Sequence, residues 1–354
     1  MRPKVYFFSL KKGDDRSRLG DGLRRILSLK GTLDFIKNDA LVALKLSFGE
    51  KDNKGHLSAD LIRPVVDSVL SLKAKPFLIE TNTLYKGDRQ NAVDHINLAL
   101  RHGYGKLSIP IVIADGLRGE EGKEVSINGP LLKNARIARG ALSADSLIGI
   151  AHATGHMLSS YGGAIKNIGM GLATRSGKQI QHSNTKPKVG RDKCTACRSC
   201  IEGCPSDAII IRDDKAFIDE KKCVGCAECI VKCAFDAIGI SWSEGSGNMQ
   251  KKMSEYAFAV LKSKAGKSFF INFAIDITKD CDCMEKEGNI IAEDVGILAS
   301  GDIVALDLAT IDTINDRAGR DVFMEAYPSL DWRVQIEHAC DIGLGSKDYE
   351  LEMI

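Results

Sequence analysis

Two stretches of the chain decide its fold: residues 193–209 read KCTACRSCIEGCPSDAI, and residues 222–238 read KCVGCAECIVKCAFDAI. Each cysteine of the first stretch recurs in the second at the constant offset that relates Cys194 to Cys223. The leading lysine and the closing Asp-Ala-Ile recur at the same offset. Cysteines repeated at a constant spacing indicate a shared framework of ligands or bonds. The two stretches are therefore read as one duplicated unit, called the cysteine repeat below.

The spacing C-x2-C-x2-C-x3-C, with Pro205 after the first quartet, is typical of bacterial ferredoxins that carry two [4Fe–4S] clusters. Three cysteines on one tight turn can bind three irons, and the fourth thiolate comes from the other motif. We therefore predict one cluster on Cys194, Cys197, Cys200 and Cys233, and a second on Cys223, Cys226, Cys229 and Cys204. Ala234 stands where the second motif usually has proline, which is not a ligand.

Two other uses of these cysteines were weighed. Pairs of the C-x2-C type also build zinc sites, but zinc does not require a third cysteine at the same short spacing in both motifs. A disulfide framework is typical of small secreted chains with an even number of cysteines. This chain has 354 residues and 11 cysteines. Both features favour the iron–sulfur interpretation.

The composition is that of an ordinary soluble globular protein, with 44% hydrophobic and 27% charged residues. The net charge is +2 and the two signs are interspersed, so we expect no nucleic-acid or membrane partner. Residues 1–15 hold no apolar core of the signal-peptide type, and no apolar run reaches transmembrane length. With 11 cysteines and no export signal, the expected location is the cytoplasm.

Short apolar runs alternate with amphipathic stretches on both sides of the cysteine repeat. The runs before it span 5–10, 41–46, 76–79, 109–114 and 147–151, and the helical patterns span 18–29, 60–72, 90–101 and 131–142. After it, we expect helices at 251–263, 307–314, 322–327 and 331–339, with strands at 268–277 and 294–299. Such alternation predicts an α/β fold with a largely parallel sheet.

The cysteine repeat interrupts this alternation of apolar runs and amphipathic stretches. We predict a first part of the α/β domain at 1–186, a small inserted α+β ferredoxin-like domain at 187–242, and a second part of the α/β domain at 249–354. Residues 243–248 read SEGSGN and look like an exit linker. The alternative, a separate C-terminal domain, is less favoured because few linker-like segments divide the α/β parts.

Polar residues follow several of the apolar runs. Lys45, Glu80, Asp115, His152 and Asp276 each stand at the end of one. In open α/β sheets, ligands bind in the crevice beyond the carboxyl ends of the strands, so these residues are site candidates. The plainer explanation is that strand ends meet solvent. Lys45 is the sharpest case, because a lysine at the edge of a buried run needs a partner or a ligand.

A glycine-rich segment at 162–171 carries Lys166, and Arg175, Lys178 and His182 follow it. Glycines let backbone amides approach a ligand, and the cations suit an anion such as a carboxylate or phosphate. The segment matches neither a dinucleotide-binding fingerprint nor a phosphate-binding loop, and a flexible connector is the alternative. The candidate catalytic residues are Lys45, Asp115, Lys166 and His182.

A third cysteine feature is the C-x-C pair formed by Cys281 and Cys283. Two thiolates so close can bind one soft metal ion, and further ligands can come from His152, His156 or His182. A redox dithiol and an inert pair are the alternatives. Because Asp276, Asp280, Asp282 and Glu285 would attract a cation and raise the thiol pKa, we predict one additional metal ion here.

These residues resemble the prokaryotic family called domain of unknown function 362, in its version with a two-cluster ferredoxin unit. The matching pieces lie at 45–50, 85–89, 115–116, 162–171 and 177–178, in both cysteine motifs, and at 281–283, 302–307 and 342–346. Ile303 departs from the pattern, where many relatives have proline. The resemblance implies iron–sulfur binding and brings no established reaction.

The function expected from the sequence is iron–sulfur electron transfer between two [4Fe–4S] clusters and a cleft in the α/β domain, with a redox partner protein or reductant and a small anionic ligand. Two alternatives stay open. One is a non-catalytic ferredoxin-type electron carrier. The other is a non-redox, anion-binding or metal-dependent enzyme whose clusters are structural or sense oxygen. The sequence names no substrate, reaction or oligomeric state.

Overall fold

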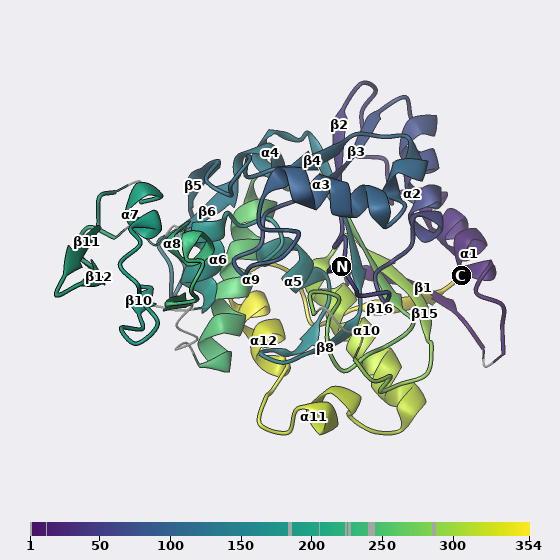
Figure 1. Cartoon of the computed structure of the whole chain (residues 1–354). Helices are drawn as coiled ribbons and strands as arrows, with labels where there is room; N and C mark the ends of the chain where they lie inside the picture. Colours follow the sequence, from purple (N-terminus) through teal and green to yellow (C-terminus); the bar gives the residue numbers. More distant parts are fainter. Residues whose placement is uncertain are drawn as a thin grey trace.

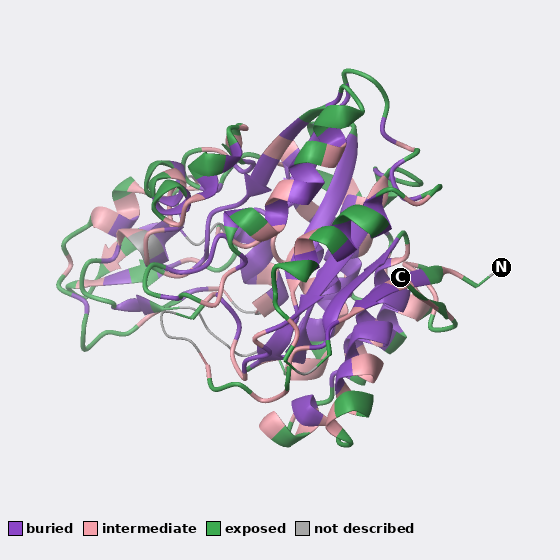
Figure 2. Ribbon diagram, turned by 90° about the vertical axis from the view of Figure 1, so that its right-hand side faces the viewer, coloured by how far each residue is buried: buried purple, intermediate pink, exposed green. Residues whose placement is uncertain are grey.

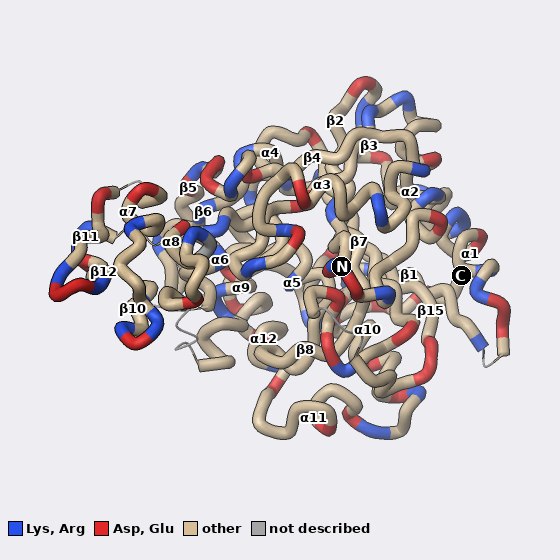
Figure 3. The backbone as a smooth tube through the Cα atoms, viewed as in Figure 1, with Lys and Arg blue, Asp and Glu red and all other residues tan. Residues whose placement is uncertain are grey.

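The structure is a computed structural model of the chain, and it describes residues 2–11, 13–182, 186–204, 206–223, 225, 228–239, 245–284 and 288–354, without the side chain of Val231. Pro205, the predicted ligand Cys226 and the acidic neighbour Glu285 lie outside the described residues, as does part of the expected linker at 243–248. Basic and acidic residues are interspersed over the described part of the chain (Figure 3). None of the described helices is long and apolar enough to cross a membrane.

One mixed, mostly parallel sheet forms the centre of the molecule (Figure 1). Its strands lie in the order β16 (Glu350–Met353), β1 (Lys4–Ser9), β15 (Gly296–Ser300), β14 (Ser268–Ala274), β7 (Ser146–His152), β2 (Leu41–Lys45), β3 (Lys75–Glu80) and β4 (Ile111–Ile113). Neighbours run parallel except at β15, which is antiparallel to β1 and β14. The predicted α/β fold with a largely parallel sheet is confirmed.

Helices cover both faces of the sheet, which explains why its strands read as continuous apolar runs. Helices α1 (Arg18–Leu27), α2 (Ala59–Ser71) and α3 (Ala92–Arg101) and the 3-10 helix η1 (Tyr104–Leu107) pack on one face. On the other face lie α4 (Arg139–Ser143), α5 (Ala164–Gly169), α9 (Ser246–Lys262), α10 (Ile303–Ala318), α11 (Val322–Ala326) and α12 (Arg333–Asp341). The central strands are buried between these two layers (Figure 2).

Most expected elements are present, but not all have the expected bounds. Helix α9 begins at Ser246, so residues 246–248 of the expected linker at 243–248 are helical. The helix expected at 131–142 is wrong: the stretch forms β6 (Asn134–Ala138), which pairs with β5 (Gly122–Ser126), and then the short α4. Ala135 and Ile137 are buried on alternate positions of β6, a period of two that the mixed pattern obscured. Helix α10 begins earlier than expected, because the side chain of Asp302 accepts hydrogen bonds from the amides of Val304 and Ala305.

The cysteine repeat is also a repeat in structure. Helix α7 (Ser199–Glu202) and helix α8 (Glu228–Lys232) begin at equivalent positions of the two motifs. The left-handed φ of 48° at Asp207 recurs at Asp236 as 50°, and the φ of 56° at Ala196 recurs at Gly225 as 71°. Equivalent positions of the two motifs thus share the same unusual backbone conformation.

Two small strand pairs hold the halves of the cysteine repeat together. Strand β10 (Lys188–Val189) pairs with β13 (Ile238–Gly239), and β11 (Ile209–Arg212) pairs with β12 (Lys215–Ile218). The repeat projects from one end of the molecule (Figure 1), and its own small apolar core includes Leu84 of the α/β part.

All strands of the central sheet come from residues 4–152 and 268–353, so the chain before and after the repeat builds one sheet. The domain boundaries at 187 and 242 stay a prediction, because 183–185 and 240–244 lie outside the described residues.

Candidate functional site

A cavity of about 430 Å³ opens at the carboxyl ends of β2, β3 and β7. Lys45, Glu80 and His152, the last residues of these strands, all line it. Lys166 and His182, the other candidates from the glycine-rich segment and the helix that follows it, line it as well. The cavity thus lies at the sheet edge where α/β folds bind ligands.

Of the four candidate catalytic residues, Asp115 does not line this cavity, and neither does the strand-end candidate Asp276. Asp115 is fully buried, and it accepts hydrogen bonds from the backbone amide of Asn82 at 3.0 Å and from Asn82 Nδ2 at 2.9 Å. Burial raises the pKa of Asp115 to about 6, although Lys178 and Arg175 oppose that rise. Its position is that of a residue that shapes the loop after β3.

The ammonium group of Lys45 is bound by three groups of the protein itself. Its Nζ lies 2.8 Å from Glu80 Oε1, and it donates to Asn167 Oδ1 at 2.9 Å and to the carbonyl oxygen of Leu46 at 3.0 Å. Burial lowers the pKa of Lys45, and the carboxylate of Glu80 opposes that shift. All three hydrogens of the ammonium group therefore have acceptors, as a buried lysine requires.

A second buried ion pair extends this network. Arg89 Nε lies 3.1 Å from Glu50 Oε2, and Arg89 Nη1 lies 3.6 Å from Glu80 Oε2. Two cations and two carboxylates thus balance one another on this wall of the cavity. Such a network fixes the geometry of the wall, because each member is held by a charged partner.

Two further lysines give the cavity its excess positive charge. Lys178 Nζ donates to Thr81 Oγ1 at 2.6 Å and to the carbonyl oxygen of Asn82, and Lys166 Nζ lies 3.5 Å from Cys283 Sγ. Among the described residues, neither has a carboxylate within 4.0 Å. Burial lowers the pKa of each to about 8, and burial together with these lysines lowers the pKa of His182 to about 4.

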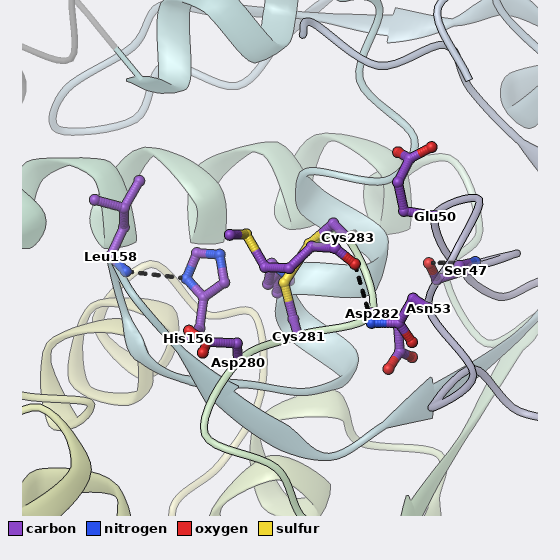
Figure 4. The surroundings of a disulfide bond; sticks show 12 residues. Ser47, Glu50, Asn53, His156, Leu158, Asp280, Cys281, Asp282 and Cys283 are labelled. Atoms are coloured by element: carbon purple, nitrogen blue, oxygen red, sulfur yellow. Dashed lines mark hydrogen bonds between the residues drawn. A yellow bond between two sulfur atoms is a disulfide. The ribbon is translucent and has the colours of Figure 1, made fainter. Parts of the chain in front are cut away.

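Cys281 and Cys283 also line the cavity and are joined in a disulfide bond (Figure 4). The turn that carries them is held by backbone contacts: the Glu50 amide donates to the carbonyl oxygen of Asp282 at 2.9 Å, and Tyr85 Oη donates to that of Cys283 at 3.2 Å. His156 offers a ring nitrogen, and this atom and both sulfurs lie within 4.8 Å of one another. The donor set of the three residues suits a soft metal ion.

Two of the four acidic neighbours have partners of their own. The Asp282 carboxylate lies 3.0 Å from His152 Nδ1, and Asp276 pairs with Arg16 at 2.6 Å. Burial alone would lower the pKa of His152, but Asp282 raises it to about 9, so the two side chains form a charged pair. Asp280 lines the cavity together with both cysteines. The metal ion at Cys281 and Cys283 stays a prediction.

The four cysteines predicted for the first cluster surround one small cavity in the cysteine repeat. They are Cys194, Cys197, Cys200 and Cys233. The Ala216 amide donates to Cys194 Sγ at 3.3 Å, and the Ala237 amide donates to Cys233 Sγ at 3.2 Å. Amide hydrogen bonds of this kind stabilise thiolates at iron–sulfur centres, so the site fits the predicted cluster.

Three of the four cysteines predicted for the second cluster are described. Cys204, Cys223 and Cys229 belong to the small core of the repeat, and the Ala208 amide donates to Cys204 Sγ at 3.3 Å. The Ala237 amide makes the same contact with Cys233 at the equivalent position of the second motif. The cross-ligation by Cys204 stays a prediction.

The loop after β3 connects the cavity with the cysteine repeat. Leu84, Tyr85 and Lys86 all line the cavity. Lys86 Nζ also donates to the carbonyl oxygen of Cys233 and pairs with Asp236, both in the repeat. Sequence reasoning missed this link, and it also missed Glu50 and Arg89 as members of the buried network. The only sequence feature that pointed to Glu50 and Arg89 is their position in the stretches 45–50 and 85–89, which carry the resemblance to the family.

The glycine-rich segment does not present its first helical amides to the cavity. The amides of Ala164 and Ile165, which begin α5, donate at 2.8 Å to the carboxylate of Asp307. Gly163 is needed for packing, because a Cβ there would lie 2.2 Å from Tyr161 Oη. The segment contributes six residues to the cavity wall: Gly162, Gly163, Lys166, Asn167, Met170 and Gly171.

The family model described as "Domain of unknown function (DUF362)" matches residues 42–312. No protein with a curated description matches. Among solved structures, the lactate racemase apoprotein from Thermoanaerobacterium thermosaccharolyticum is 14% identical, with a TM-score of 0.39. That alignment covers 78% of this chain and 51% of the other, so the chain spans about half the length of that protein.

Proposed function

Because the chain belongs to the family described as "Domain of unknown function (DUF362)", a description that names no reaction, we propose its function from the site itself. The protein is an iron–sulfur oxidoreductase whose cysteine repeat exchanges electrons with a small anion bound in the cavity. The observation that carries this proposal is the position of Lys86, which lines the cavity and contacts Cys233.

The cofactors of this proposal are two [4Fe–4S] clusters. Cys194, Cys197, Cys200 and Cys233 would hold one, and Cys204, Cys223, Cys226 and Cys229 would hold the other. When bound, such a cluster supplies one-electron transfer at low potential. The shared cavity of the first quartet and its amide hydrogen bonds support this assignment.

The α/β part would bind and orient the anion. Lys166 and Lys178 supply positive charge that no described carboxylate neutralises within 4.0 Å, and the Lys45–Glu80 pair fixes the wall between them. A cavity of about 430 Å³ suits a small molecule. A simple electron carrier has no use for a buried, cation-lined cavity, so this feature favours an enzyme over the carrier alternative.

The first test is the cofactor content of anaerobically purified protein. We expect about eight irons and eight sulfides per chain, with visible absorbance that bleaches on reduction by dithionite. Stoichiometric zinc without sulfide would sink the iron–sulfur part of the proposal.

The second test is communication between the cavity and the cysteine repeat. Oxalate, a small dianion, is added to the reduced protein, and the midpoint potential of the clusters is followed by visible absorbance. A bound anion within reach should make the clusters harder to reduce, and Lys86→Met should weaken this coupling. Lys221→Met, an exposed lysine of the same repeat, is the matched control. A midpoint potential that does not change at saturating oxalate would contradict the proposed communication between the cavity and the cysteine repeat.

A further inference from the structure

We propose that Cys281 and Cys283 form a redox-active pair at the cavity wall, which alternates between a disulfide and a dithiol and so stores two electrons beside the bound anion. The inference rests on the proposed function, since it assigns a chemical role to one wall of the same cavity. It replaces the metal ion that the sequence predicted between these residues.

The position of the pair is the first observation. The two sulfurs are bonded to one another, and both residues line the cavity (Figure 4). Cys281 is 8% exposed, so bulky reductants cannot approach it from the surface. The turn is clamped at three carbonyl oxygens: Asn53 Nδ2 donates to that of Met284 at 3.0 Å, alongside the contacts of Glu50 and Tyr85. The sulfurs therefore stay at the cavity when their bond opens.

The charges around the pair favour a thiolate. Lys166 Nζ lies 3.5 Å from Cys283 Sγ. The nearest carboxylate in sequence, that of Asp282, is paired with His152 at 3.0 Å. A cation beside a sulfur stabilises the thiolate and makes it the better leaving group when the disulfide is reduced. Cys283 is therefore the sulfur that leaves as the anion.

A continuous set of contacts joins this pair to the cysteine repeat. Tyr85 Oη donates to the carbonyl oxygen of Cys283, and the next residue, Lys86, donates to the carbonyl oxygen of Cys233. Cys233 is one of the four cysteines around the small cavity of the repeat. Two consecutive residues thus contact both the redox pair and a predicted cluster ligand.

The chemistry balances with the proposed cofactors. The disulfide bond breaks and takes up two electrons, which two reduced iron–sulfur clusters, held by the cysteine repeat, would supply. Cys283 becomes a thiolate beside the Lys166 ammonium, and Cys281 takes up one proton. That proton comes from solvent in the cavity, and the nearest relay is His156, whose ring nitrogen lies within 4.8 Å of both sulfurs. The reverse step returns two electrons and one proton to a bound substrate.

The direct test counts thiols in the whole protein, purified anaerobically. The protein is quenched in acid and alkylated, and the tryptic peptide 280–286, which holds no other cysteine, is weighed. We expect a disulfide with the clusters oxidised and two alkylated thiols after titration with dithionite. Two thiols in both states would overturn the proposal. So would a ninth metal equivalent that Cys281→Ser with Cys283→Ser removes.

A second measurement tests the role of Lys166. The whole protein is equilibrated with mixtures of reduced and oxidised dithiothreitol, then quenched, alkylated and digested, and the same peptide is weighed to obtain the equilibrium constant of the pair. Lys166→Met should shift that constant about tenfold toward the disulfide, or about 30 mV more negative, because the thiolate loses its cation. Lys178→Met removes the same charge from the same cavity without a sulfur contact and should change it less than about threefold. Equal shifts in both variants would contradict the contact.

The two proposals fail in different ways. If the protein contains no iron, the proposed function fails, and the dithiothreitol titration still decides whether the pair is redox-active. If the clusters are present but peptide 280–286 never changes, the pair is inert and the proposed function stands without it.

Discussion

Arg175 and Glu228 form a buried ion pair in which Nη1 and Oε2 lie 2.8 Å apart. Arg175 begins α6 (Arg175–His182) of the α/β part, and Glu228 begins α8 of the cysteine repeat. Arg175 Nε also donates to the carbonyl oxygen of Thr83 at 3.2 Å, in the loop that lines the cavity. One guanidinium group thus ties the repeat to the cavity loop.

Removing Glu228 should therefore loosen the repeat. Glu228→Ala removes a carboxylate that pairs with the buried guanidinium of Arg175, and we expect a loss of about 3–5 kcal/mol in the free energy of unfolding. Urea unfolding followed by circular dichroism measures it. Glu220→Ala, an exposed glutamate of the same repeat, should change stability by less than about 0.5 kcal/mol. Similar small losses in both variants would show that the pair contributes little.

Because each predicted cluster takes its fourth ligand from the other motif, a substitution of that ligand should affect the cluster of the other motif. Cys204→Ala should damage the cluster held mainly by the second motif, and Cys233→Ala the cluster held mainly by the first. Each variant should retain about four irons. Electron paramagnetic resonance of the two reduced variants distinguishes the remaining clusters. If each change erases the cluster of its own motif, the ligand assignment is wrong.

Lys45 and Lys166 should respond differently to the same substitution. Lys45→Met leaves Glu80 in the interior without its closest cation, so we expect a loss of about 3–5 kcal/mol in stability. Lys166→Met removes a cation with no described carboxylate partner and should lower oxalate affinity about tenfold or more with little loss of stability. Calorimetric titration and urea unfolding separate the two outcomes, and equal stability losses would contradict this division of roles.

Oxalate binding should weaken as the pH rises through about 8, because burial lowers the pKa of Lys166 and Lys178 to about 8. Below that pH both side chains carry a proton and attract the dianion; above it they become neutral. Oxalate stays fully ionised across this range, so the change belongs to the protein. Calorimetry between pH 6 and 9.5 should show the decline, with a shallower one in Lys178→Met. Affinity independent of pH would contradict the role of these lysines.

Two helical glycines provide a matched test of packing. A Cβ at Gly169 of α5 would lie 2.2 Å from the carbonyl oxygen of Met253, whereas one at Gly247 of α9 would meet nothing within 4 Å. Gly169→Ala should destabilise the protein by about 2 kcal/mol or more. Gly247→Ala should stabilise it by about 0.5–1 kcal/mol, because alanine loses less backbone entropy in a helix. Thermal unfolding compares the two, and equal effects would refute the predicted close packing of α5 on α9.

The fold was largely predictable because its signals are local. Continuous apolar runs marked the strands of the sheet, and the cysteine spacing marked the repeat without any knowledge of the tertiary structure. The stretch 131–142 failed because Ala135 and Ile137 alternate within a pattern that also fits a helix. Strand β16 was missed because its residues, Glu350–Met353, carry little apolar signal and are ordered by pairing with β1.

The site was predictable only in part. Strand ends gave Lys45, but its partner Asn167 is distant in the sequence and only folding brings the two together. Asp115 also stands just after a strand, yet its carboxylate accepts a hydrogen bond from Asn82. The partners of Asp276 and Asp282, which are Arg16 and His152, could not be predicted for the same reason: nearness in sequence says nothing about which carboxylate already has a partner.

The strand pairing within the cysteine repeat bears on its ancestry. At the offset that relates the two motifs, β10 corresponds to the end of β12, and β11 corresponds to β13. Yet β10 pairs with β13 and β11 pairs with β12, so each strand of one half finds its partner in the other. A single half could form these strand pairs only with a second copy of itself. The unit thus has the arrangement expected of a symmetric dimer whose two copies have been joined in one chain.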